Sequence, residues 1–250
     1  SRSNLQLRQP QARNIDGIQI VSGIVDGDPN NMATLVRDGS NLRGRVWKNG
    51  ALYRISGDKS GDYRLSEINV AHISSEKDDL VVPKATGNNK ARRNTSGQGS
   101  FPRVDEAIDL MIAVTPRLIT KMGGMNKLLL ELKLLVAETN NIYRRSGATA
   151  GTMFRLVGVH NLMKNGFKYL EYDLHEWATD RGIIKQRNRL GADLVAFISA
   201  PEDPEICGMG YFGPQATDPE PLPELGFSIS AGICAFGNLT FAHELGHNLG

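Results

Sequence analysis

The first third of the chain is a series of short apolar stretches separated by tight-turn signals. Apolar and polar residues alternate over residues 42–47, and the dipeptide Asn49-Gly50 that follows is a strong signal for a two-residue hairpin turn. Similar signals recur along residues 18–68, which predicts a meander of short antiparallel strands. Residues 1–15 are polar and lack this alternation, so we predict a loose chain end there.

The pattern changes after a stretch that is poor in large apolar side chains. Residues 84–103 contain almost none before Phe101, a composition typical of a flexible linker. This linker would divide the chain into a β-rich domain at residues 1–83 and a second domain at residues 104–250. The pair Arg92-Arg93 within the linker is either a dibasic cleavage site or ordinary solvated charge.

Apolar runs and helical periodicity alternate from residue 104 onward, which predicts an α/β domain. Buried strands are expected at residues 107–114, 152–159, 192–198 and 226–231. Helices are expected at residues 127–145 and 172–189. The first helix has one apolar face, formed by Leu128, Leu132, Leu135, Thr139 and Ile142.

The bulk composition excludes several classes of protein. The chain is 40% hydrophobic and 22% charged, which is ordinary for a globular protein. Its net charge of +2 is too close to balance to indicate a nucleic-acid partner. No apolar run approaches the roughly 18 residues that a membrane helix needs, so no membrane span is expected. The chain starts at Ser1 without Met, and we expect a processed or excised piece of a longer protein.

Residues 241–250 have the spacing of a metal site on a helix. His243 and His247 are four residues apart, so both imidazoles lie on one helix face and can reach a single metal ion. Glu244 lies about 100° around the helix from His243, where it can act on a metal-bound water as general base. This spacing is the zinc motif of metallopeptidases. The alternative is a helix with two surface histidines and no metal.

The other positions of this helix indicate how it packs. Apolar residues at spacings of three and four predict that it packs on a sheet and leaves the histidines in a cleft. This stripe consists of Leu239, Ala242, Leu245 and Leu249. Gly246 and Gly250 each cost about 1 kcal/mol relative to Ala in a helix, so something other than helix stability selects them. Gly250 would end the helix in a left-handed turn, and Asn238 or Thr240 would cap its start.

The stretch from His243 to Gly250 resembles the start of the metzincin motif, and its wording is similar to that of the reprolysin/adamalysin branch of zinc metallopeptidases. The resemblance implies a zinc-dependent metalloendopeptidase made as a zymogen, with Zn²⁺ on His243 and His247 and with Glu244 as general base. It implies an α/β (α+β) fold: the upper catalytic subdomain of a metzincin, with a mixed five-stranded sheet and long helices, preceded by a β-rich pro-domain. A third histidine is expected three residues beyond Gly250.

The resemblance also assigns a role to residues 207–213. In that family this stretch is an edge strand along the cleft, and an extended peptide substrate pairs with it antiparallel. The substrate-binding residues would be Gly208, Met209, Gly210 and Tyr211. An ordinary edge strand without this role is the alternative.

The chain has two cysteines, Cys207 and Cys234. By themselves they are compatible with two buried thiols or with a disulfide. The resemblance favours the disulfide, because reprolysin-like domains carry a bridge between similar positions. A disulfide implies an oxidising compartment, so we expect a secreted, extracellular protein.

The expected partners are a protein or peptide substrate and the chain's own pro-domain. Residues 1–103 contain no cysteine, so a pro-region cysteine cannot hold the zinc. A carboxylate, His72 or simple steric blocking of the cleft remain as means of latency. A thermolysin-like zinc peptidase and a catalytically inactive binding or adhesion protein on a metallopeptidase scaffold are the alternative functions. The β-rich domain could instead be a small binding module.

Overall fold

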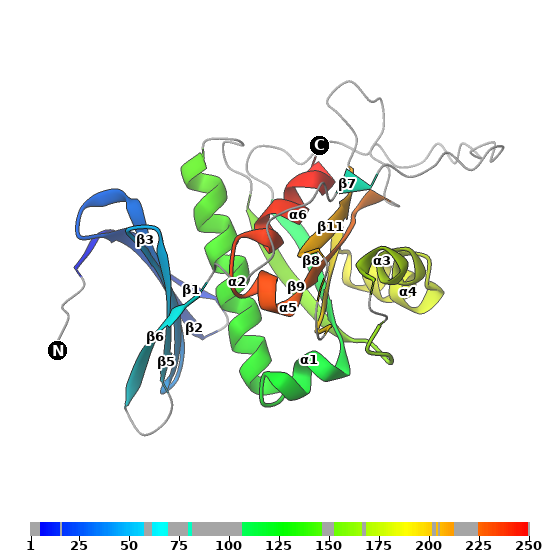
Figure 1. Cartoon of the computed structure of the whole chain (residues 1–250), viewed down its shortest axis with the longest axis horizontal. Helices are drawn as coiled ribbons and strands as arrows, with labels where there is room; N and C mark the ends of the chain where they lie inside the picture. Colours follow the sequence, from blue (N-terminus) through cyan, green and yellow to red (C-terminus); the bar gives the residue numbers. More distant parts are fainter. Residues whose placement is uncertain are drawn as a thin grey trace.

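A computed structural model of the chain describes residues 6–15, 17–57, 62–69, 80–81, 107–146, 153–166, 169–201, 204, 206–212 and 225–249. Within them the chain forms two sheets that lie on opposite sides of one long helix, α2 (Met125–Ser146) (Figure 1). No helix among these residues is long and apolar enough to cross a membrane. The predicted linker at residues 84–103 lies outside the described residues, and the domain boundaries there remain a prediction.

The first sheet is an antiparallel meander of six strands in chain order, as predicted for residues 18–68. Asn49 and Gly50 both have positive φ, at 53° and 78°, as a tight hairpin turn requires. The strands are β1 (Leu7–Ile15), β2 (Ile18–Val25), β3 (Asp28–Asp38), β4 (Asn41–Lys48), β5 (Ala51–Gly57) and β6 (Tyr63–Ile68).

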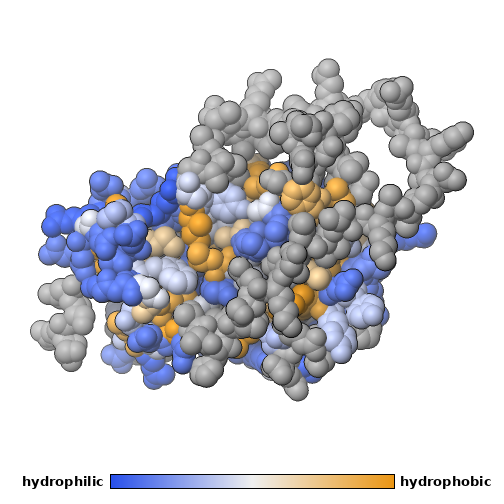
Figure 2. All heavy atoms as spheres, turned by 45° about the horizontal axis from the view of Figure 1, so that its top comes forward, coloured by the Kyte–Doolittle hydropathy of each residue, from blue (hydrophilic) through white to orange (hydrophobic). Residues whose placement is uncertain are grey.

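The prediction of a loose end over residues 1–15 was wrong for β1, which pairs with β2 up to Ile15 opposite Ile18. Every residue of β1 after Leu7 is exposed, so the strand is held by its backbone hydrogen bonds and shows no apolar alternation. Hydrophilic side chains correspondingly predominate over this sheet, at the left of Figure 2.

The second sheet is mixed and has the order β7-β11-β12-β10-β8-β9. Five of its strands come from the second half of the chain: β8 (Ile108–Val114), β9 (Phe154–Asn161), β10 (Leu194–Ser199), β11 (Gly208–Tyr211) and β12 (Phe227–Ala231). Only β11 runs antiparallel to its neighbour among these five, which confirms the predicted mixed five-stranded sheet. The sixth, β7 (Leu80–Val81), comes from the first half and pairs parallel with β11.

Helices cover both faces of the second sheet (Figure 1). The single helix predicted at residues 172–189 was wrong, because the chain forms two helices there. The Asp180 side chain caps the second one by accepting hydrogen bonds from the Gly182 and Ile183 amides at 2.8 and 3.0 Å. The helices besides α2 are α1 (Pro116–Lys121), α3 (Leu170–Ala178), α4 (Arg181–Leu190), α5 (Gly232–Ala235) and α6 (Thr240–Leu249).

Helix α2 has two buried faces rather than the one that the sequence predicts. Leu128, Leu132 and Leu135 belong to the core of the second sheet. Leu130, Leu134 and Ala137 form a separate cluster with Ile18 and Val36 of the first sheet. The helix therefore packs against both sheets, one on each face.

A buried ion-pair network joins the first sheet to α2. Arg45 of β4 is only 2% exposed, and its Nη1 lies 2.5 Å from Glu138 Oε2. Trp47 Nε1 donates to Glu138 Oε1 at 2.9 Å, and Arg43 Nε lies 3.1 Å from Glu131 Oε1. The Arg45 guanidinium also lies 5.6 Å from the ring centre of Phe236, beyond α2. Both buried carboxylates are thus compensated by groups of the first sheet.

Candidate metal and catalytic site

The two motif histidines converge on one point. Their Nε2 atoms are 3.0 Å apart, and the ring planes meet at 84°. Two ligands of a tetrahedral zinc site with bonds of about 2.0–2.1 Å would be about 3.3 Å apart, so a single ion can take both nitrogens with a small adjustment. His243 is exposed and His247 is half-buried, so the pair is open to solvent on one side. The donor atoms and their spacing therefore fit zinc.

Glu244 lies on the side of α6 that packs against β11. Its residue is completely buried, and its carboxylate is so close to β11 that a Cβ added to Gly208 would be 2.3 Å from Oε1. A Cβ added to Gly210 would be 2.9 Å from the Glu244 carbonyl oxygen and 3.0 Å from His247 Cβ. The two glycines thus allow the helix that carries the histidines to lie directly on β11.

Helix α6 starts one residue later than the predicted apolar stripe. Leu239 precedes the helix and is 39% exposed, so its place in the stripe was wrong. The predicted Leu245 and Leu249 do pack in the core of the second sheet, and Phe241 joins them. The Thr240 amide donates to Asn238 Oδ1 at 2.8 Å, which makes Asn238 the capping residue.

Gly246 is explained by a contact from α2. The Tyr143 hydroxyl donates to the Ala242 carbonyl at 3.0 Å, and a Cβ added to Gly246 would be 3.2 Å from that hydroxyl oxygen. Burial raises the pKa of Tyr143 to about 12, so the hydroxyl keeps its proton and remains a donor. Glycine at residue 246 thus leaves room for the hydrogen bond that joins Tyr143 of α2 to α6. Gly250 lies outside the described residues.

The expected disulfide is present. Cys207 and Cys234 are bonded, with Cα atoms 5.4 Å apart. The bond ties the residue before β11 to α5, the short helix that precedes α6. It therefore holds the start of the edge strand and the approach to the motif helix together.

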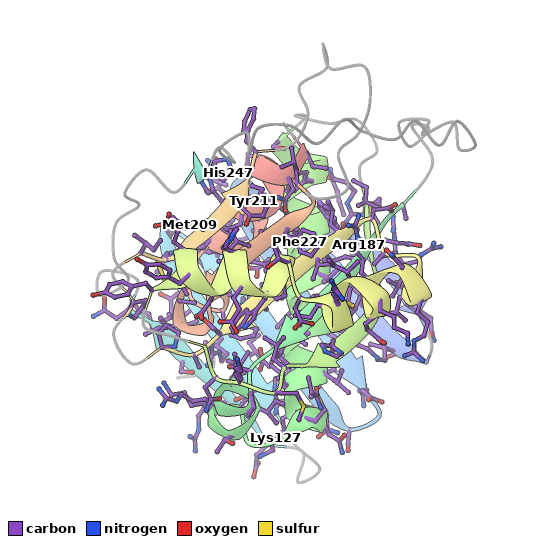
Figure 3. The ribbon with its side chains drawn as sticks, turned by 90° about the vertical axis from the view of Figure 1, so that its right-hand side faces the viewer. Lys127, Arg187, Met209, Tyr211, Phe227 and His247 are labelled. Carbon is purple, nitrogen blue, oxygen red and sulfur yellow. A yellow bond between two sulfur atoms is a disulfide. The ribbon has the colours of Figure 1, made fainter. Side chains whose placement is uncertain are left out.

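The four predicted substrate-binding residues form β11. The expected edge position was wrong for this structure, because β11 lies between β12 and β7. Gly210 is opposite Leu80, and Tyr211 is opposite Val81, in a parallel ladder. Figure 3 shows Met209, Tyr211 and His247 at the same end of the molecule. The structure thus brings β11 and the histidine pair together, and it places a segment of the first half of the chain along the same strand edge.

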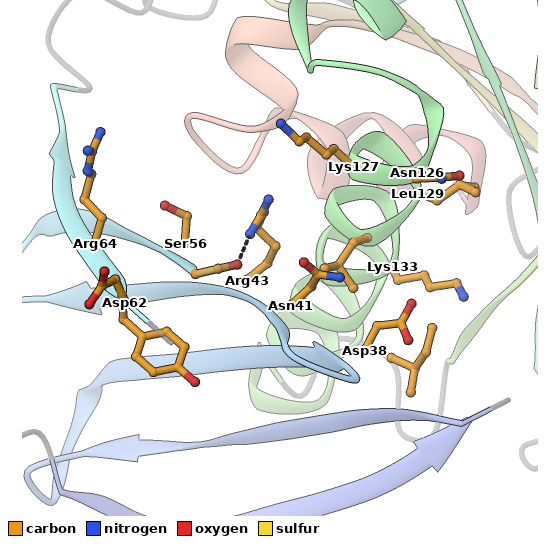
Figure 4. A pocket seen from close by; sticks show the side chains of 14 residues that line it. Asp38, Asn41, Arg43, Ser56, Asp62, Arg64, Asn126, Lys127, Leu129 and Lys133 are labelled. Carbon is orange, nitrogen blue, oxygen red and sulfur yellow. Dashed lines mark hydrogen bonds between the residues drawn. The ribbon is translucent and has the colours of Figure 1, made fainter. Parts of the chain in front are cut away.

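A third metal ligand is not found among the described residues, where no three His, Cys, Asp or Glu side chains are grouped to hold a metal ion. A large cavity of about 910 Å³ lies elsewhere, between β4–β6 and the first half of α2 (Figure 4). Arg43, Lys127 and Lys133 line it, and Arg43 Nη1 donates to the Gly57 carbonyl at its wall. This cavity does not touch the histidines.

Two residues that hold α6 in place were missed by the sequence analysis. Tyr143 comes from a distant helix, and nothing in the local pattern marks it. Asn248 follows His247 directly and is 5% exposed. Its position four residues after Glu244, on the same helix face, was the available signal.

A helix with two converging histidines and a buried glutamate, packed on β11 of a mixed sheet, fits a metallopeptidase domain. Residues 130–250 match the model of metallo-peptidase family M12B, reprolysin-like. The match supports the metzincin resemblance of this part of the chain and favours it over a thermolysin-like enzyme.

The chain is similar to two curated proteins named peptidyl-Asp metalloendopeptidase. It is 26% identical over 228 residues to that of Stenotrophomonas maltophilia and 27% identical over 229 residues to that of Xanthomonas campestris pv. campestris. Each match covers 88% of this chain and 51% of the relative, so the chain spans about half the length of these relatives. The fold is also similar to that of metalloproteinase-II from Bacteroides fragilis, with a TM-score of 0.51 and 13% identity over 96% of this chain and 76% of that one.

Proposed function

We propose that this protein is a zinc metalloendopeptidase. The observation that carries the proposal is the 3.0 Å separation of His243 Nε2 and His247 Nε2 on a helix whose Glu244 is buried against the edge strand. His243, His247 and one further side chain would hold the ion. A bound zinc ion would supply Lewis-acid chemistry for water and for the peptide carbonyl.

The residues of this domain would then position the peptide and transfer the proton. The backbone of β11 would hold an extended peptide by strand addition, which requires little of the peptide's sequence. The Glu244 carboxylate would accept a proton from the attacking water and deliver it to the departing amine nitrogen. Its place beside Gly208 would keep this carboxylate next to the bound peptide.

We also propose that the protein is made in a latent form. The support is the parallel pairing of Leu80 and Val81 with Gly210 and Tyr211, on the edge where the substrate would bind. Since these residues belong to the predicted β-rich domain at residues 1–83, that domain would act as a pro-domain that blocks the cleft sterically. The disulfide between Cys207 and Cys234 supports secretion into an oxidising compartment.

The substitution Glu244→Gln, measured in the full-length protein after proteolytic activation, tests the peptidase assignment. The variant should keep its zinc, because both histidines are intact, and should lose cleavage of a casein substrate by at least about 100-fold, the scale of a general base. Glu176→Gln is the matched control, since Glu176 pairs with Lys164 on the surface of α3. Wild-type cleavage rates in Glu244→Gln would refute the assignment. Stoichiometric zinc without any wild-type cleavage would favour the inactive binding protein.

A further inference from the structure

We propose that Asn248 is a positioning residue that fixes the edge strand relative to the metal-binding helix, an inference that rests on the proposed peptidase function. The Asn248 side chain leaves α6 and reaches both strands beneath it. Its Nδ2 donates to the carbonyl oxygens of Tyr211 at 2.8 Å, Phe227 at 2.9 Å and Leu225 at 3.1 Å. Tyr211 ends β11, and Phe227 starts β12.

The chemistry of the three neighbours determines the orientation of this amide. All three are carbonyl oxygens, which only accept, so the NH₂ group must face them and the amide oxygen must point away. Asn248 is 5% exposed, so water cannot readily replace the amide if it is removed. No other uncharged side chain of similar size presents two donor hydrogens from so short a stem.

The position of Asn248 in the chain gives these bonds their importance. The residue follows His247 directly, so the same helical turn carries a metal ligand and the bonds to the end of β11. The Tyr211 carbonyl belongs to the strand that would hold the substrate, and it is held by α6 rather than by a partner strand alone. Asn248 therefore sets the distance between the histidine pair and the backbone ladder on which a peptide would lie.

This position differs from that of Asn238, the other asparagine at α6. Asn238 uses Oδ1 to accept the Thr240 amide and hydroxyl at 2.8 and 2.6 Å, and an aspartate can accept in the same way. Its Nδ2 makes only a long contact of 3.9 Å to Cys207 Sγ. Asn248 uses Nδ2 to donate, and an aspartate there would set a carboxylate against three carbonyl oxygens. The substitution Asn→Asp thus has opposite consequences at the two ends of one helix.

The experiment compares Asn248→Asp with Asn238→Asp in the full-length protein after proteolytic activation. Asn248→Ala is a second variant, because it removes the donor without adding charge. Each is measured for zinc content, for thermal unfolding and for kcat and KM. One substrate is a peptide long enough to pair with β11, and the other is too short to reach it. Backbone hydrogen exchange is recorded for residues 208–212 and 225–229.

For both Asn248 variants we expect full zinc content and a kcat/KM on the long peptide that falls about tenfold or more, the scale of losing one or two buried hydrogen bonds. The loss on the short substrate should be several-fold smaller, and exchange in residues 208–212 should quicken. Asn238→Asp should match the wild type in all of these. A general loss of stability would affect the two substrates alike.

Equal losses on both substrates, or unchanged exchange in residues 208–212, would overturn the role of Asn248. If Asn248→Asp does not fold, Asn248→Ala decides by the same criteria. The proposed peptidase function fails separately, if the zinc-loaded wild type cleaves neither substrate. The exchange measurement does not depend on activity, so it still tests the role of Asn248 in that case.

Discussion

At the scale of single residues, the site depends on two glycines that leave no room for a side chain. Gly208 and Gly210 lie where α6 meets β11, and each would place a Cβ 3.0 Å or less from atoms of the motif helix. Neither has the left-handed backbone that usually explains a glycine. Their role is therefore close packing of a helix on a strand.

We predict that Gly208→Ala displaces Glu244, because the new methyl group would lie 2.3 Å from its Oε1. Peptidase activity should fall at least about tenfold while zinc content is unchanged, as expected when a general base moves out of reach. Steady-state kinetics and metal analysis of the purified variant measure both. Gly182→Ala is the control. It lies on the exposed start of α4, away from α6 and β11, and should keep full activity.

The sequence predicts some residues of the site and misses others. His243, Glu244 and His247 come from one helix, so spacing along the chain was enough to identify them. Tyr143 and Asn248 act through contacts with separate elements, and such contacts depend on how those elements pack. The requirement for glycine at residues 208 and 210 likewise becomes visible only when α6 lies on β11.

At the scale of elements, α2 gives the clearest difference between sequence and structure. Its predicted inner face is correct for Leu128, Leu132 and Leu135. Its second buried face carries Glu131 and Glu138, which in a sequence indicate a solvent-exposed side. The carboxylates are buried because arginines of β4 meet them, and this pairing joins residues about 90 positions apart in the chain. Helical periodicity alone cannot predict such a partner.

We predict that Glu138→Gln or Arg45→Met alone lowers the free energy of unfolding by about 3–5 kcal/mol, because each leaves one buried charge without its partner. The double variant Arg45→Met/Glu138→Leu should recover most of that loss, since two apolar groups replace the pair. Urea unfolding of the four proteins measures these differences.

Removal of the exposed Lys164–Glu176 pair should cost less than about 1 kcal/mol and serves as the control. If the double variant were as unstable as the two single variants combined, the pairing would not be the source of the loss.

At the scale of the whole molecule, the described residues before position 84 contact the second domain in two places. One is the face of α2 with its apolar cluster and ion pairs. The other is the short ladder between β7 and β11. Together they place these residues both against α2 and along β11, the strand on which we propose that a peptide binds.

We predict that a single cut within residues 84–103 leaves the two halves associated, because the α2 interface does not depend on the linker. Size-exclusion chromatography after limited proteolysis should show both fragments in one peak. Peptidase activity should remain low until the N-terminal fragment is removed or degraded. Immediate separation of the fragments, with full activity after the cut alone, would contradict this prediction. The Arg45→Met variant should separate more readily than the wild type.

The strand orders of the two sheets have a consequence for how the chain folds as it is synthesised. Neighbouring strands of the first sheet are also neighbours in the sequence, whereas the second sheet has the order β7-β11-β12-β10-β8-β9. Local pairings form faster than distant ones, and N-terminal segments leave the ribosome first. The meander is therefore expected to be complete before the second sheet can close. Its face of apolar side chains and arginines would then already be in place when α2 emerges, and the nascent helix would fold against it.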